Sequence, residues 1–163
     1  MDFHLSAAAR DACQRMWGFM PEEVFPADPC GRNTFVNTGS TLIPPIMEPL
    51  KESARSRGLW NLFLPAWSGL SNLDYAIIAE ISGWSPVIAP EATNCQAPDT
   101  GNMRTLELFT LELFATSGQR TRWLEPLKEG RIRSAFAMTE PAVASSDATN
   151  VETISCETVT STW

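Results

Sequence analysis

Residues 136–147 read Phe-Ala-Met-Thr-Glu-Pro-Ala-Val-Ala-Ser-Ser-Asp, and they decide how the rest of the chain is interpreted. The apolar run from Ile132 to Met138 predicts a β-strand, which the following Thr-Glu-Pro ends. The loop after it consists of small residues with two adjacent serines and an aspartate. Small residues let a backbone approach a ligand closely, and hydroxyl and N–H groups at a turn can hold a phosphate or the polar edge of a ring. The stretch therefore predicts a ligand-binding strand and loop.

The composition is that of a globular protein with one domain, or one domain and part of another. The chain has 163 residues, of which 44% are hydrophobic and 19% charged, with a net charge of −7. No basic stripe is present, so nucleic acid is not an expected partner. We interpret Lys51, Arg55 and Arg57 as one solvated helix face. No apolar stretch approaches the ~18 residues that span a membrane, so no membrane span is expected.

The cysteines and the N-terminus favour a reducing compartment. No C-x-x-C pair is present, and His4 is the one histidine, so no metal site is expected. We expect reduced and mostly buried thiols at the four cysteines, which are Cys13, Cys30, Cys95 and Cys156. The first residues form neither a secretory signal nor an Arg-rich transit peptide, so a cytoplasmic location is expected.

Hydrophobic periodicity predicts helices over most of the first 130 residues. A helix capped by Ser6 runs to about Met20, where Pro21 ends it or starts a new segment, and residues 26–41 are interpreted as a loop. A second helix starts at the Pro44-Pro45 pair and stops at Gly58.

Further along the chain, Ser71 or Asn72 caps a third helix that is apolar on most sides, which predicts a central place in a bundle. Residues 85–101 are interpreted as a proline-rich loop and residues 102–116 as a helix. A last short helix turns Trp123, Leu124 and Leu127 inward and ends at Gly130.

One local feature is a tandem repeat, in which Thr-Leu-Glu-Leu-Phe occurs at residues 105–109 and again at 110–114. Five residues turn a helix by roughly 140° beyond a full turn, so the two copies cannot present the same face. The repeat is interpreted as a small duplication that forces apolar residues outward.

Several blocks, together with the stretch at 136–147, resemble the acyl-CoA dehydrogenase family, in the branch that often has long-chain specificity. The blocks are residues 50–65, 69–76, 97–103, 122–127 and 132–141, and the likeness spans about residues 1–152. The resemblance implies a mainly α fold, with residues 1–130 as the N-terminal helical domain and residues 131–163 as the beginning of the middle β domain. It also implies FAD as the cofactor, acyl-CoA as the substrate and α,β-desaturation of the thioester as the reaction.

The same resemblance assigns roles within the signature. Phe136 and Met138 match positions that pack against the flavin ring, although alone they would be interpreted as core residues of a strand. Thr139 matches the residue that bonds the pyrimidine edge. Ser146 matches the serine that bonds the FAD pyrophosphate and lies against the acyl-CoA, and Ser145 stands where many members carry glycine.

Other residues near the signature have weaker roles. Glu140, Pro141 and Asp147 are expected to shape the loop, since carboxylates can accept the free N–H groups of a turn. Residues 94–97 lie where the family builds part of the acyl pocket.

The resemblance further implies that the chain stops before the second flavin segment and the C-terminal helical domain. That domain supplies the catalytic glutamate and the oligomer contacts of the family's homo-oligomers, so no catalytic residue is nominated here. We therefore expect an incomplete member that is inactive alone and prone to self-association. Two alternatives stay open: a non-catalytic helical relic or interaction protein, and an acyl-CoA oxidase.

Overall fold

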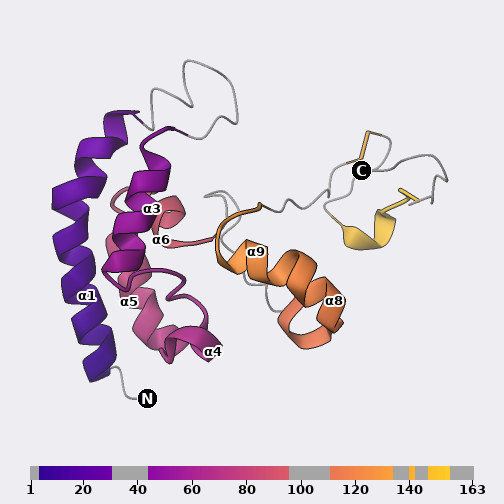
Figure 1. Ribbon diagram of the computed structural model, residues 1–163, viewed down its shortest axis with the longest axis horizontal. Helices are drawn as coiled ribbons and strands as arrows, with labels where there is room; N and C mark the ends of the chain where they lie inside the picture. Colours follow the sequence, from indigo (N-terminus) through magenta and orange to yellow (C-terminus); the bar gives the residue numbers. More distant parts are fainter. Residues whose placement is uncertain (1–3, 31–43, 96–110, 134–139, 142–146, 155–163) are drawn as a thin grey trace.

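The computed structural model describes residues 4–30, 44–95, 111–133, 140–141 and 147–154 (Figure 1). Four helices lie together on one side of the molecule: α1 (Ala7–Phe19), α3 (Met47–Ser56), α5 (Asn72–Ser82) and α6 (Ile88–Thr93). The short helix α4 (Pro65–Ser68) connects α3 to α5. Beside this group lies a continuous helical rod formed by α8 (Ser117–Gln119), η3 (Arg120–Leu124) and α9 (Glu125–Lys128). The mainly α fold predicted from the sequence is confirmed for the described residues.

The first helix begins where the sequence predicts. The Ser6 side chain accepts a hydrogen bond from the Ala9 backbone N–H, which satisfies one of the orphan donors of the first turn. Ala9, Ala12, Met16 and Phe19 form its buried face. The Ser6 N–H in turn donates to Asp74 Oδ1 at 3.0 Å, so the same residue joins the starts of α1 and α5.

Pro21 does not end this helix. The chain continues through a π-helical segment, η1 (Met20–Val24), and stays helical over residues 25–30. The wider π turn accommodates the proline, which has no N–H to contribute and would otherwise collide with the preceding turn. The loop predicted for residues 26–41 is therefore wrong at 26–30, and the rest of it lies outside the described residues.

The end of α3 and the start of α5 follow their local signals, whereas α3 begins at Met47, two residues after the predicted Pro44-Pro45 start. Gly58 follows the C-cap of α3 at φ +65°, a left-handed conformation that glycine adopts without strain. At the start of α5, Ser71 and Asp74 form a reciprocal capping box.

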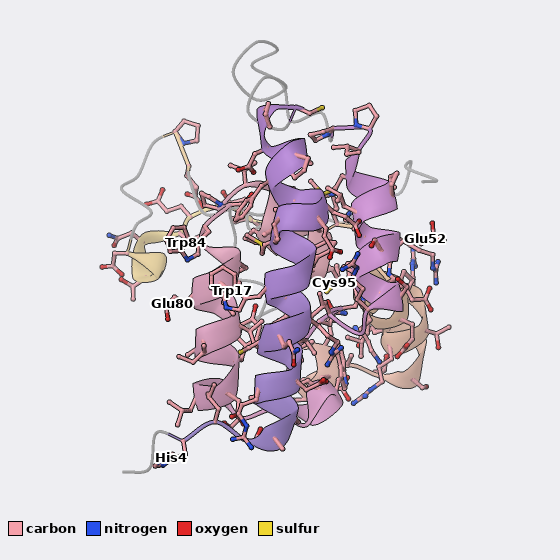
Figure 2. All side chains as sticks on the ribbon, turned by 90° about the vertical axis from the view of Figure 1, so that its left-hand side faces the viewer. His4, Trp17, Glu52, Glu80, Trp84 and Cys95 are labelled. Carbon is pink, nitrogen blue, oxygen red and sulfur yellow. The ribbon has the colours of Figure 1, made fainter. Side chains whose placement is uncertain are left out.

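Helix α5 buries one face rather than lying in the centre of a bundle. Ile78 and Ile81 are buried, whereas Leu73 and Ile77 are exposed. Trp84, just beyond the helix, is 68% exposed, and Trp17 of α1 lies on the same side of the molecule (Figure 2). Because only the face with Ile78 and Ile81 is buried, the prediction of a central helix is wrong for the described part of the chain.

A second correction concerns residues 85–101, which contain a helix rather than an uninterrupted loop. Helix α6 runs from Ile88 to Thr93 and contains Pro90 in its first turn, where a missing N–H costs nothing. Ile88, Ala89 and Ala92 are buried against α3 and α5. Residues 96–101 lie outside the described residues.

The rod of α8, η3 and α9 packs on a separate small cluster, defined here as Leu64, Cys95, Leu124 and Leu127. Trp123 is exposed beside Arg122, so the prediction that it turns inward is wrong. Gly130 ends the rod at φ +71°, as predicted. Just before α8, Leu113 and Phe114 of the second repeat copy are 66% and 79% exposed, as the duplication predicts.

After the rod, Arg131 and Ile132 form a bend, and none of the described residues lies in a strand. Of the strand predicted for residues 132–138, Ile132 and Arg133 are described and do not lie in a strand, and residues 134–138 lie outside the described residues. The β domain therefore stays a prediction. None of the helices in the described part is long and apolar enough to cross a membrane.

Candidate functional site

The residues predicted to hold a flavin lie outside the described residues. They are Phe136, Met138, Thr139, Ser145 and Ser146. The structure describes what lies around them, namely the exit from the rod at Arg133, the loop residues Glu140 and Asp147, and the turn after them. Their roles therefore stay predictions.

The two carboxylates of the signature are engaged by backbone N–H groups. The Glu140 carboxylate accepts from the N–H groups of Thr153 at 2.9 Å and Glu152 at 3.1 Å. Hydrogen bonds from Thr153, through its side chain and backbone, and from Glu152 hold the pKa of Glu140 below its ordinary value. The carboxylate therefore accepts hydrogen bonds from backbone N–H groups, although these belong to residues 152 and 153 and not to the adjoining turn, and its role in shaping the loop stays a prediction.

Asp147 accepts hydrogen bonds within the turn that follows it. Its Oδ1 accepts from the Thr149 hydroxyl at 2.7 Å and the Thr149 N–H at 3.0 Å, and both bonds lower the pKa of Asp147. Both carboxylates are thus committed to main-chain and hydroxyl donors further along the chain.

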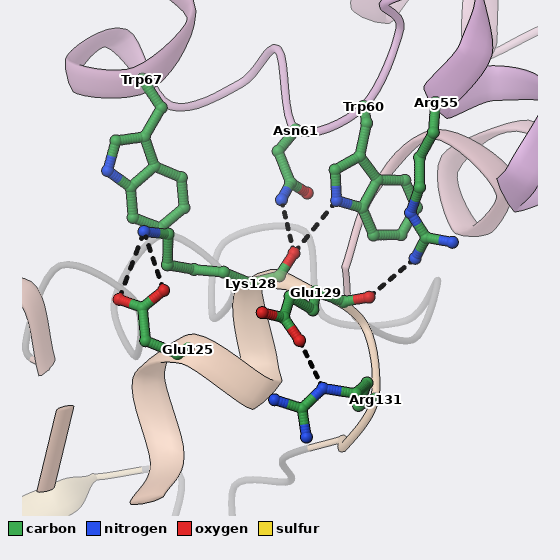
Figure 3. A pocket seen from close by; sticks show the side chains of 8 residues that line it. All are labelled: Arg55, Trp60, Asn61, Trp67, Glu125, Lys128, Glu129 and Arg131. Carbon is green, nitrogen blue, oxygen red and sulfur yellow. Dashed lines mark hydrogen bonds and ion pairs between the residues drawn. The ribbon is translucent and has the colours of Figure 1, made fainter. Parts of the chain in front are cut away.

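A cavity of about 700 Å³ lies between the α3–α4 connection and α9 (Figure 3). Two rings and a carbonyl define it. Arg55 stacks 4.0 Å from the centre of the Trp60 ring, and Lys128 Nζ lies 4.1 Å from the centre of the Trp67 ring. The Lys128 carbonyl accepts from Trp60 Nε1 at 3.0 Å.

The charged groups of this cavity are already paired within it. Glu125 pairs with Lys128, Glu129 pairs with Arg131, and Arg55 donates to the Glu129 carbonyl at 2.7 Å. Among the described residues, the lining contains no serine, threonine, cysteine or histidine, and its lysine and carboxylates are held in these pairs. We interpret the cavity as the polar joint that fixes the rod to the helices, rather than as a reaction site.

Asn61 is the centre of that joint, and sequence reasoning missed it. Its side chain donates to the Lys128 carbonyl at 2.9 Å and accepts from the Cys95 N–H at 3.0 Å, while its own N–H donates to the Thr93 carbonyl at 2.9 Å. Asn61 has φ +57°, which asparagine tolerates better than other residues with a side chain. The signal in the sequence is a polar residue inside an apolar run.

The four residues at 94–97 were expected to help build an acyl pocket, and the first two are buried in the described part. Asn94 donates to the Pro90 carbonyl at 2.8 Å, and Cys95 packs in the small cluster. Of the other cysteines, Cys13 is half-buried and Cys30 is exposed, so the expectation of buried thiols is wrong at Cys30.

Lys51 corrects the interpretation of a solvated basic face. Its ammonium group is buried and pairs with Glu91 Oε1 at 2.9 Å, and Arg133 donates to the same oxygen. Arg57 is half-buried and pairs with Glu22 and Glu23 at 2.9 and 2.5 Å. Lys51 and Arg57, which were predicted to face solvent, therefore form ion pairs with residues of other helical segments.

The fold defines a helical domain followed by a loop built on backbone-bound carboxylates. No protein-family model matches the chain. A solved structure assigned to the acyl-CoA dehydrogenases, from Mycobacterium abscessus, superposes with a TM-score of 0.73 at 43% identity. The superposition covers 90% of this chain and 38% of that one.

Curated relatives agree with this likeness. The chain is 56% identical over 155 residues to the probable acyl-CoA dehydrogenase FadE2 of Mycobacterium tuberculosis, covering 94% of this chain and 37% of that protein. It is 49% identical over 154 residues to acyl-CoA dehydrogenase family member 11 of Gallus gallus, covering 92% and 19%. The chain belongs to the acyl-CoA dehydrogenase family and spans between a fifth and two fifths of the length of these relatives.

Proposed function

We propose that this chain supplies the N-terminal helical domain and the first flavin-contacting segment of an FAD-dependent acyl-CoA dehydrogenase. The observation that carries the proposal is the 56% identity to a probable acyl-CoA dehydrogenase over 94% of the chain, which includes the signature. The hydrogen bonds that Glu140 and Asp147 accept from backbone N–H groups support it, because they fix the described residues on both sides of the predicted flavin-contacting loop.

In this proposal the chain's own residues hold and shield the cofactor. The Thr139 hydroxyl and N–H donate to the pyrimidine edge of the flavin, where donors stabilise negative charge. Phe136 and Met138 exclude water from the ring. Ser146 donates to the pyrophosphate and lies against the acyl-CoA, with Ser145 beside it in close backbone approach.

The chemistry that FAD supplies when bound is the acceptance of hydride from the β-carbon of the acyl-CoA thioester. Removal of the α-proton needs a base, and we assign that base to no residue of this chain. The isolated chain is therefore proposed to be inactive, with a cytoplasmic location proposed for the whole protein.

The proposal is tested with a chimera in which this chain replaces the matching part of the Mycobacterium tuberculosis relative. We expect the purified chimera to contain FAD and to lose its flavin colour when acyl-CoA is added without air. We expect Thr139→Ala and Ser146→Ala to lower the FAD content, whereas Thr121→Ala on the exposed rod leaves it unchanged. A folded chimera that contains no flavin contradicts the proposal.

A second candidate function is a non-catalytic interaction protein. Exposed Trp17 and Trp84 lie on the same side of the molecule (Figure 2), and Leu73 and Ile77 of α5 are also exposed; these side chains favour it, since exposed apolar side chains promote association. A chimera without flavin, combined with a chain that self-associates through this face, supports the second candidate. Substituting serine for Leu73 and Ile77 then abolishes the self-association.

A further inference from the structure

One buried carboxylate connects the helices to the place where the chain leaves them. Glu91, on α6, has a side chain that is 3% exposed. Its Oε1 pairs with Lys51 of α3 at 2.9 Å and also accepts from the guanidinium of Arg133. Lys51 is also 3% exposed and pairs with the exposed Glu48 at 3.2 Å. We call Lys51, Glu91 and Arg133 the buried triad.

The buried triad is not expected to contribute much to the free energy of folding. Removing two charges from water costs several kcal/mol per ion, and their attraction often does no better than an apolar pair of the same volume. Glu91 Oε2 is buried and accepts no hydrogen bond from the described residues, so both cations depend on one oxygen. Such an arrangement fixes geometry at the expense of stability, which indicates a positioning role.

Arg133 lies shortly before the residues that are predicted to contact the flavin. Arg133 is the last described residue before residues 134–139, and it lies three residues before Phe136 and six before Thr139 along the chain. A contact that fixes Arg133 therefore fixes the point from which the chain enters the predicted flavin-contacting residues.

We propose that Glu91 is a positioning residue for the flavin signature and acts through Arg133. Glu91 holds the exit of the chain against α3 and α6, and Lys51 binds the same carboxylate oxygen and fixes its position. The inference rests on the proposed function, because it concerns how the same signature is aligned with the helices.

The first experiment measures amide hydrogen exchange in this chain as it stands, residues 1–163. We expect Arg133→Met and Glu91→Gln to raise exchange over residues 134–141 by roughly tenfold, the size expected for loss of a charge-assisted hydrogen bond. Exchange in α1 and α5 stays unchanged. Arg131→Met is the matched control, because Arg131 pairs with Glu129 and both side chains are exposed.

Arg133→Lys separates positioning from packing, since lysine keeps the charge and is expected to restore much of the protection. Three outcomes overturn the inference: segment 134–141 unprotected in the unaltered chain, Arg133→Met equal to Arg131→Met, or a uniform rise throughout the chain. If Glu91→Gln does not fold, Arg133→Met and Arg133→Lys still decide between a positioning role and a packing role.

The second experiment places the same variants in the flavin-binding chimera and measures FAD content. We expect Arg133→Met to lower the affinity for FAD, and Arg133→Lys and Arg131→Met to leave it close to that of the unaltered chimera. An unaltered chimera without FAD refutes the proposed function, while the exchange experiment still judges the positioning role. Unchanged FAD affinity in Arg133→Met overturns the inference.

Discussion

The four-helix group and the rod of α8, η3 and α9 are held in place by different forces. The four-helix group surrounds a large apolar cluster that includes the fully buried Met16, Phe19 and Ile88. The rod contributes only Leu124 and Leu127 to a small cluster and is otherwise fixed by hydrogen bonds to its last carbonyls. Burial is non-directional and sums over area, whereas hydrogen bonds specify one geometry. The first region should therefore decide whether the chain folds, and the second where its exit points.

The largest effect is expected from Phe19→Ala, which empties the centre of the large cluster. Because Phe19 is fully buried, the free energy of unfolding should fall by about 3–5 kcal/mol. Urea denaturation followed by circular dichroism measures it. Trp17→Ala on the exposed side of the same helix is the control and should cost under ~0.5 kcal/mol. Equal losses in the two variants would show that the large cluster is not the main source of stability.

Asn61→Ala should loosen the rod and leave the four-helix group folded. It removes the acceptor of the Cys95 N–H and a donor to Lys128, and it puts alanine at positive φ, for a combined cost of about 2–4 kcal/mol. Asn61→Gly keeps the backbone conformation, so the difference between the two variants isolates the backbone term. Hydrogen exchange measures the change in the α9 amides, and unchanged protection there would refute the polar joint.

The same contrast explains how much of the fold could be predicted. Ser6, Ser71, Gly58 and Gly130 act within a few residues of themselves, so their caps and stops were correct. Pro21 and Pro90 were interpreted as signs of a helix end and of a loop. Both lie in helical segments, because a π turn and the first turn of a helix accommodate proline. The apolar composition of α5 predicted a central helix, whereas Ile78 and Ile81 are buried and Leu73 and Ile77 are exposed.

In the candidate site, too, contacts between residues near in sequence were predictable and contacts between distant residues were not. The role of Asp147 was predictable, since its partner Thr149 lies two residues away, whereas Glu140 accepts from residues 12 and 13 positions further along the chain. Lys51 could not be predicted, because its partner Glu91 is distant in sequence and only tertiary packing brings them together. Asn61 likewise shows its role only when α6 and α9 meet over it.

Deleting residues 110–114 should stabilise the approach to the rod. One copy of the repeat leaves Leu113 and Phe114 exposed, and its removal is expected to raise the free energy of unfolding by about 1–3 kcal/mol. Thermal denaturation measures the gain. The double variant Leu113→Ser with Phe114→Ser keeps the length and should reduce association without stabilising. A deletion that destabilises the chain would show that both copies are needed.

Gly130→Ala tests the end of the rod on a smaller scale. A Cβ there would lie 3.1 Å from Trp60 Cζ2 at φ +71°, so a loss of about 1–2 kcal/mol is expected. Gly69→Ala is the matched control, since it has φ +72° but nothing within 4 Å of the added atom. Chemical denaturation compares the two, and equal losses would mean that packing against Trp60 contributes nothing.

The smallest expected effect is the dependence of stability on pH through Asp74. The Ser6 N–H, followed by the Ser71 hydroxyl, lowers the pKa of Asp74, so the folded state favours the carboxylate. That contribution is present above the unfolded pKa of about 3.9 and is lost as the pH falls through the lower folded value. Asp74→Asn should melt below the unaltered chain at neutral pH, and the gap should close below about pH 4. A gap independent of pH would contradict this assignment.

The most direct test of the central claim is the FAD content of the chimera that carries this chain. The account predicts stoichiometric FAD in the purified chimera, reduced by Thr139→Ala, by Ser146→Ala and by Arg133→Met. A folded chimera that contains no FAD would contradict the claim that this chain supplies a flavin-contacting segment.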